Sequence, residues 1–246
     1  MYIKNQYVSL TYRLIFLGLC GYGIMRHLSV SDSIRNINML SYFTIQSNIL
    51  CFFVALASVV HNFIEIRKDE IVPYTRAMLF FRGMSILVIT ITFFTYSIVL
   101  TKVGFSMNAN SSPMMTINDL FVHYMIPILA WVDFILFQPK PSFKRKDPIK
   151  WLIAPLIYFV FILIKGRYMD GGTTLVGLKR YPYYFLDAEK YGYAFVFKYA
   201  IVFLVVCVVM GYAIWSLDFI FGMIYTKLIC PLWKKFHKQS KVEERT

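Results

Sequence analysis

The 246-residue sequence has few charged residues, and acidic residues are especially scarce. Asp, Glu, Lys and Arg together make up 16% of the chain, and only 13 residues are Asp or Glu. Soluble domains carry about 25% charged residues, which they need to cover an apolar core. The shortage argues against a water-soluble globular domain, and the 58% content of hydrophobic residues argues against disorder.

Signatures of common catalytic and cofactor-binding sites are also missing. The sequence contains no Gly-x-Ser-x-Gly elbow, no His-Glu-x-x-His zinc motif and no phosphate-binding glycine loop. The four cysteines are isolated within or beside apolar segments, without metal-ligand spacing: Cys20, Cys51, Cys207 and Cys230. The sequence therefore predicts neither a metal nor a cofactor.

Long apolar runs take the place of these motifs. A helix needs about 20 apolar residues to cross a hydrocarbon core roughly 30 Å thick. Six stretches meet or approach this length: residues 9–29, 39–61, 77–101, 119–138, 150–166 and 193–226. We predict an all-α integral membrane protein, in which residues 1–246 form a single bundle of six transmembrane helices.

The net charge of +13 indicates how this bundle is oriented. With a cytoplasmic N-terminus, most of the 26 Lys and Arg fall at that terminus, in segments 62–76 and 139–150, and in the tail after Thr226. This is the positive-inside bias of a protein with an even number of helices and both termini in the cytoplasm. The basic loops are short and lack a nucleic-acid-binding motif, so we expect contact with anionic membrane lipids and no nucleic acid partner.

Two polar residues are expected at one depth in the outer half of the membrane. Thr44 and Asn48 lie four residues apart near the start of segment 39–61, and Asp119 and His123 are four apart at the start of segment 119–138. Both segments run in the same direction, which places Thr44 and His123 within about one helical turn of the same depth. A hydroxyl beside an imidazole is the minimum arrangement for a nucleophile that a base activates.

Structural roles compete with this interpretation. Threonine in membrane helices usually bonds its own backbone or links neighbouring helices, and a histidine near a helix end often faces water or a headgroup. From these two residues alone a structural role is favoured over catalysis. Asp133 lies about 15 Å deeper than His123, and we expect it to cap a helix, to pair with a basic loop or to fix helix packing.

The segment between the last two helices, residues 167–193, is rich in aromatic residues. It contains Tyr181-Pro182-Tyr183-Tyr184-Phe185-Leu186-Asp187. Such a segment is expected to fold back onto the bundle, as an anchor at headgroup level or, slightly less favoured, as a lid. Asp187 then competes with Asp119 as the carboxylate that orients His123.

Three motifs together resemble the six-transmembrane Pr6Pr family. They are Phe43-Thr44-Ile45-Gln46-Ser47-Asn48, His123 with Pro127 and Asp133, and the segment from Tyr181 to Asp187. That bacterial group is similar to the eukaryotic androgen-induced-protein family, whose characterised members are threonine hydrolases that cleave fatty acid esters of hydroxy fatty acids. The resemblance implies a place in the bacterial cytoplasmic membrane and a catalytic pair of Thr44 and His123. One departure is Tyr184, where the bacterial pattern often has a second proline.

We therefore expect an intramembrane hydrolase of fatty-acyl esters, with Thr44 as nucleophile and His123 as base. Asn48 is expected to donate to the oxyanion or to tether the imidazole, and Asp119 or Asp187 to fix the histidine tautomer. Membrane lipids and an apolar acyl ester are the expected partners. The alternative is a non-enzymatic membrane protein that binds or transports a lipid or small solute through the same pocket. A purely structural bundle would require Thr44 and His123 to face different neighbours.

Overall fold

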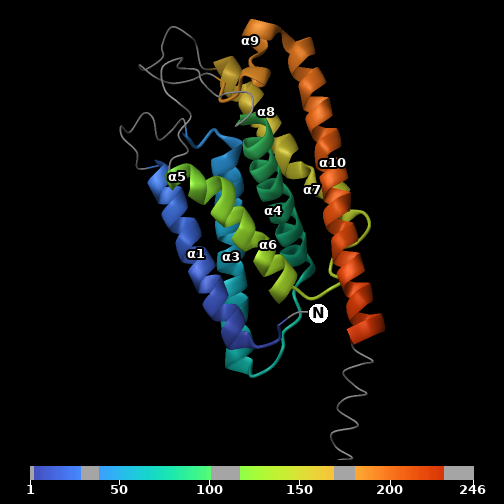
Figure 1. Ribbon diagram of the computed structural model, residues 1–246. Coiled ribbons are helices and arrows are strands. Elements are labelled where there is room, and N and C mark those ends of the chain that lie inside the picture. Colours follow the sequence, from blue (N-terminus) through green and yellow to red (C-terminus); the bar gives the residue numbers. More distant parts are fainter. Residues whose placement is uncertain (1–2, 29–38, 101–116, 169–180, 230–246) are drawn as a thin grey trace, which may run out of the picture.

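The computed structural model describes residues 3–28, 39–100, 117–168 and 181–229, and this part of the chain contains helices and no strand (Figure 1). The helices are α1 (Gln6–Leu28), α3 (Phe43–Lys68), α4 (Arg76–Phe94), α5 (Ile117–Leu120), α6 (Ile126–Phe137), α7 (Asp147–Trp151), α8 (Ile153–Tyr168), α9 (Ala188–Tyr191) and α10 (Tyr193–Ile224). Four shorter turns adjoin them: the π-helical η1 (Thr95–Leu100), η2 (Phe121–Met125) and η4 (Tyr225–Ile229), and the 3-10 turn η3 (Tyr184–Leu186). Cys230, most of the basic tail and residues 169–180 of the aromatic segment lie outside the described residues.

The length and composition of the helices confirm an all-helical membrane protein. Five segments are long and apolar enough to cross a membrane: Gln6–Leu28, Phe43–Lys68, Arg76–Ile98, Asp147–Tyr168 and Tyr193–Lys227. The fourth predicted span is represented by a shorter apolar helix, Phe121–Phe137, which α5 extends at its start. The bundle thus has five full-length candidate spans and one shorter apolar helix.

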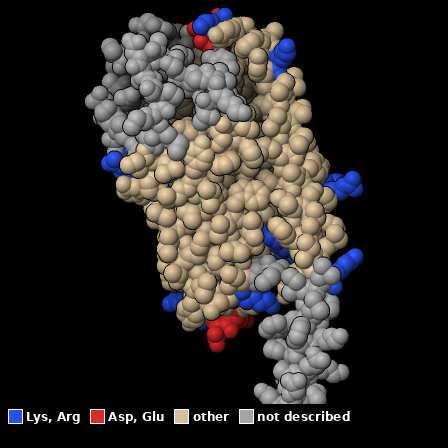
Figure 2. Space-filling model, viewed as in Figure 1, with Lys and Arg blue, Asp and Glu red and all other residues tan. Residues whose placement is uncertain are grey.

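The surface of the bundle is apolar between its two ends. Figure 2 shows a broad uncharged band on the viewed face, with most of the visible Lys, Arg, Asp and Glu near the ends. Large aliphatic side chains of the outer helices are exposed, including Ile157 of α8 at 63%, and Ile201 and Val209 of α10 at 61% and 63%. Such a band is stable when lipid covers it, whereas in water it would be a large unpaired apolar surface.

The helices pack so that both described chain ends lie together. α1 packs along α3, α3 along α4, and α4 along α6, while α8 and α10 lie on the far side of α4 from α1 (Figure 1). Residue 3 and the last turn of α10 lie at one end of the bundle, which we call the terminal end, and α9 and η3 lie at the opposite end, which we call the pocket end. That the terminal end faces the cytoplasm stays a prediction.

A buried ionic network fixes four of these helices to one another. Asp133 of α6 accepts hydrogen bonds from Arg13 Nε of α1, at 2.8 Å, and from Arg82 Nη2 of α4. Both guanidinium groups also reach α3, where Arg13 donates to Asn62 Oδ1 at 2.7 Å and Arg82 to Ser58 Oγ at 2.6 Å. Buried charges are tolerated only when they are paired and hydrogen-bonded. Asp133 therefore fixes helix packing, through arginines of neighbouring helices and not through a basic loop.

Replacing Asp133 by Asn is expected to destabilise the bundle strongly. The substitution keeps the size of the side chain but leaves two buried guanidinium groups without a carboxylate, which costs about 3 kcal/mol or more. Thermal unfolding in detergent, followed by circular dichroism, measures the loss. Asp69→Asn is the matched control, because Asp69 is exposed at φ 52° after α3, a conformation that Asn also tolerates. Equal unfolding temperatures for the two variants would contradict the role of Asp133.

Candidate active site

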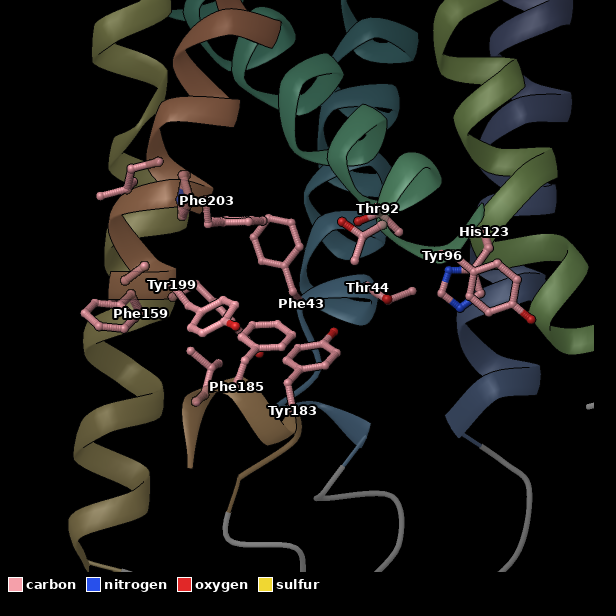
Figure 3. A pocket seen from close by; sticks show the side chains of 16 residues that line it. Phe43, Thr44, Thr92, Tyr96, His123, Phe159, Tyr183, Phe185, Tyr199 and Phe203 are labelled. Carbon is pink, nitrogen blue, oxygen red and sulfur yellow. The ribbon is translucent and has the colours of Figure 1, made fainter. Parts of the chain in front are cut away.

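A pocket at the pocket end of the bundle brings together the two residues that the sequence singled out. Thr44 of α3 and His123 of η2 both line it, and Figure 3 shows their side chains between Tyr183 on one side and Tyr96 on the other. The space in it that a water-sized sphere can occupy is about 60 Å³. Thr44 and His123 therefore face one shared cavity.

Thr44 lies where its hydroxyl group cannot make the bond that threonine commonly makes inside a helix. A threonine in mid-helix usually donates to the backbone carbonyl one turn earlier. Thr44 is the second residue of α3, so no earlier turn of this helix offers such a carbonyl. Its side chain is buried and faces the pocket. Of the two structural roles of an intramembrane threonine, the bond to the backbone of its own helix is therefore not available to Thr44.

His123 lies in a π-helical turn that Pro127 explains. The amide N–H of Ile126 donates to the carbonyl of Phe121, five residues earlier. Pro127 has no amide hydrogen, so it cannot donate to His123, as an α-helix requires, or to Val122, as a π-helix requires. The Val122 carbonyl is thereby left without its helical donor, next to the histidine in the chain.

Asn48 supplies the missing donor. Its Nδ2 donates to the carbonyl of Val122 at 3.1 Å and to the carbonyl of Thr44 at 2.7 Å. A single buried amide therefore joins the first turn of α3 to the turn that carries His123. Asn48 tethers this backbone and not the imidazole itself, and it has no amide hydrogen left for an oxyanion.

The imidazole of His123 is held in place by a ring that the sequence had not indicated. Tyr96 of η1 stacks on it, with ring centroids 3.7 Å apart and an interplanar angle of 14° (Figure 3). His123 is 6% exposed, and its Nδ1 atom has no hydrogen-bond partner within the described part of the chain. Stacking fixes the plane of the ring, and this nitrogen remains available to a ligand.

The two carboxylates predicted to orient His123 have different surroundings. Asp119, one turn before His123, is close enough to interact electrostatically with its imidazole. Asp187 instead caps α9, where its Oδ1 accepts a hydrogen bond from the backbone N–H of Lys190 at 3.0 Å. Neither carboxylate lines the pocket, and of the two only Asp119 interacts electrostatically with His123.

Tyr183 of the aromatic segment is a polar neighbour of Thr44 that sequence reasoning missed. Its hydroxyl is in hydrogen-bonding range of the Thr44 side chain and of the backbone at Phe43 and Thr44. Burial raises the pKa of Tyr183 to about 12, while these hydrogen bonds lower it, so the hydroxyl keeps its proton at neutral pH. The aromatic motif was a signal for this contact, because it predicted a segment folded onto the bundle.

Comparisons of the chain with models of protein families, with curated proteins and with solved structures each found no match. Among the described residues, no cluster of His, Cys, Asp and Glu is arranged to hold a metal ion. The function of the protein is inferred from the chemistry of the pocket and from the motifs that line it.

The tether role of Asn48 predicts a cost for removing its amide. Asn48→Leu keeps a similar volume and leaves the buried Val122 and Thr44 carbonyls without this donor, which is expected to cost about 1–3 kcal/mol. Urea or thermal unfolding of the purified protein measures the loss. Gln46→Leu is the control, because Gln46 Nε2 also donates to a carbonyl, that of Leu40. This bond is exposed, so water can replace the lost donor. If both substitutions lower the free energy of unfolding equally, the tether role of Asn48 is contradicted.

Proposed function

We propose that the protein is an intramembrane hydrolase of fatty-acyl esters, with Thr44 as nucleophile and His123 as general base. The observation that carries this proposal is that both side chains line one pocket whose other walls are mainly apolar and aromatic. The motifs that resemble the Pr6Pr family support it, because Thr44, His123 and Tyr183 come from different motifs and line this same pocket.

The reaction follows from the chemistry of the two groups. A threonine hydroxyl is weakly acidic, so it needs a base at the moment of attack. His123 takes the proton while Thr44 Oγ bonds to the ester carbonyl carbon, and the histidine then gives this proton to the departing alcohol. Water attacks the resulting acyl-threonine with His123 again acting as base, which releases the fatty acid and restores the hydroxyl. Burial disfavours the protonated imidazole that both steps pass through, and Asp119 offsets part of this cost.

We expect the acyl chain of the substrate to lie along the side of the pocket formed by α8 and α10. Phe159 of α8 and Phe203 of α10 lie on this side, away from His123 (Figure 3). Ala200 of α10 also lines the pocket. The same helices expose aliphatic side chains to the surroundings of the bundle. An acyl chain gains about 0.8 kcal/mol for each CH₂ group moved from water into an apolar environment. We expect a lipid in the bilayer to enter the pocket from the side of α8 and α10.

A non-enzymatic lipid-binding protein is the second candidate function. It is favoured by the apolar walls of the pocket, which suit an acyl chain whether or not the ester is cleaved. This function requires the walls and does not require Thr44 or His123. Substitution of these two residues therefore separates the two candidates.

Thr44→Ala and His123→Ala are each expected to lower the turnover of long-chain esters by at least a hundredfold, because each removes one member of the nucleophile–base pair. Release of fatty acid by the purified protein from a panel of esters measures this loss. Thr90→Ala and His61→Ala are matched controls, since both residues are buried and neither lines the pocket. Unchanged turnover in the two pocket variants would refute the hydrolase. Lipid binding without turnover in every form, including wild type, would favour the second candidate.

Ala200→Phe is expected to change the chain-length preference. A larger side chain at the α10 wall shortens the acyl site, so long-chain esters lose at least about tenfold in kcat/KM relative to short-chain esters. Kinetics with esters of increasing chain length measure this ratio. Ala213→Phe is the control on the same helix, because Ala213 is exposed and does not line the pocket. An unchanged ratio in Ala200→Phe would place the acyl chain elsewhere.

A further inference from the structure

The first turn of α3 lacks a cap from its own sequence. Its N-cap residue, Tyr42, makes no side-chain capping bond. The first amide groups of any helix have no carbonyl partner within it, so they require a partner from elsewhere. The Tyr183 hydroxyl meets this need, since it interacts with the backbone at Phe43 and Thr44 from a segment far along the chain.

The ring of Tyr183 is held firmly in this position. It is 8% exposed, stacks on Phe185 with centroids 5.3 Å apart at 9°, and meets Tyr42 edge-on at 5.6 Å. In Figure 3 its hydroxyl points along the pocket toward Thr44. A phenol oxygen that accepts bonds from the start of a helix becomes a stronger donor through its own hydrogen.

We propose that Tyr183 is a further catalytic residue, whose O–H group donates a hydrogen bond to the carbonyl oxygen of the ester during attack by Thr44. This inference rests on the proposed hydrolase function. It assigns the oxyanion-stabilising donor that the hydrolase needs and that Asn48 cannot be, because both amide hydrogens of Asn48 are held by carbonyls.

The atoms and charges of the step balance. As Thr44 Oγ bonds to the carbonyl carbon, the electron pair of the C=O double bond moves to the oxygen, which becomes an oxyanion. Tyr183 shares its hydrogen with this oxyanion and keeps it, while His123 holds the proton taken from Thr44. The double bond then re-forms, the bond to the alcohol oxygen breaks, and His123 protonates the alcohol. A tyrosine that stays protonated at neutral pH acts as such a donor and not as a base.

The direct experiment compares Tyr183→Phe with Tyr12→Phe. Tyr12 lies outside this pocket, and its hydroxyl donates to the carbonyl of Leu129 at 2.7 Å, so this control also removes a tyrosine hydroxyl bonded within the bundle. We expect Tyr183→Phe to lower kcat about a hundredfold with KM changed less than about threefold, and Tyr12→Phe to leave both near wild type. Affinity for a trifluoromethyl ketone, which forms an oxyanion on adding a hydroxyl, is expected to fall in parallel with kcat.

A second measurement tests the role of Tyr183 if the Tyr183→Phe variant does not fold. Replacing Tyr183 by a fluorinated tyrosine keeps the ring and the hydroxyl and makes the hydroxyl more acidic. Because a donor must be protonated, we expect the alkaline loss of kcat to begin at a lower pH than in wild type. A role confined to capping α3 would leave the pH profile unchanged.

The outcomes separate this inference from the function on which it rests. If Tyr183→Phe keeps wild-type kcat and ketone affinity while Thr44→Ala abolishes turnover, Tyr183 only caps α3 and the hydrolase stands. If Thr44→Ala and His123→Ala keep wild-type turnover, the hydrolase and the role of Tyr183 both fall.

Discussion

The carboxylate of Asp133, shared by two buried guanidinium groups, is the interaction on which the arrangement of the bundle depends. Arg13, Arg82 and Asp133 come from α1, α4 and α6, and the arginines also bond to α3. A shift of any of these helices along its axis would leave a charge unpaired in an apolar interior, at a cost of several kcal/mol. The network therefore fixes the relative depth of the helices that carry Thr44 and His123 at the other end.

Two further contacts position the polar groups of the pocket at that depth. The Asn48 amide joins the start of α3 to η2, at the carbonyl that Pro127 leaves without a helical donor. Tyr96 then fixes the plane of the His123 ring. These groups hold the polar side of the pocket rigid, whereas α8 and α10 supply an apolar side. Such a division suits a reaction on a lipid, because the reacting groups must be placed accurately while an acyl chain needs only an apolar wall.

Much of this arrangement could be predicted from the sequence because it depends on segment length and spacing. Apolar runs located the helices, and the common direction of segments 39–61 and 119–138 placed Thr44 and His123 at similar depths. The ionic network was missed, because contacts between helices depend on how each helix is rotated, which hydropathy does not report. Pro127 was noticed, but its effect on the Val122 carbonyl needed the neighbouring Asn48 in three dimensions. Tyr183 reaches Thr44 from a segment far along the chain, a contact that no local pattern specifies.

The most direct test of the central claim is to locate the covalent adduct formed with a long-chain fluorophosphonate. Intact-protein mass spectrometry gives the number of adducts, and peptide mapping gives the modified residue. If Thr44 is a nucleophile activated by His123, a single adduct forms on Thr44, and its formation slows strongly in His123→Ala. An adduct on another residue, or none on Thr44 in folded protein that binds the probe, would contradict a threonine nucleophile.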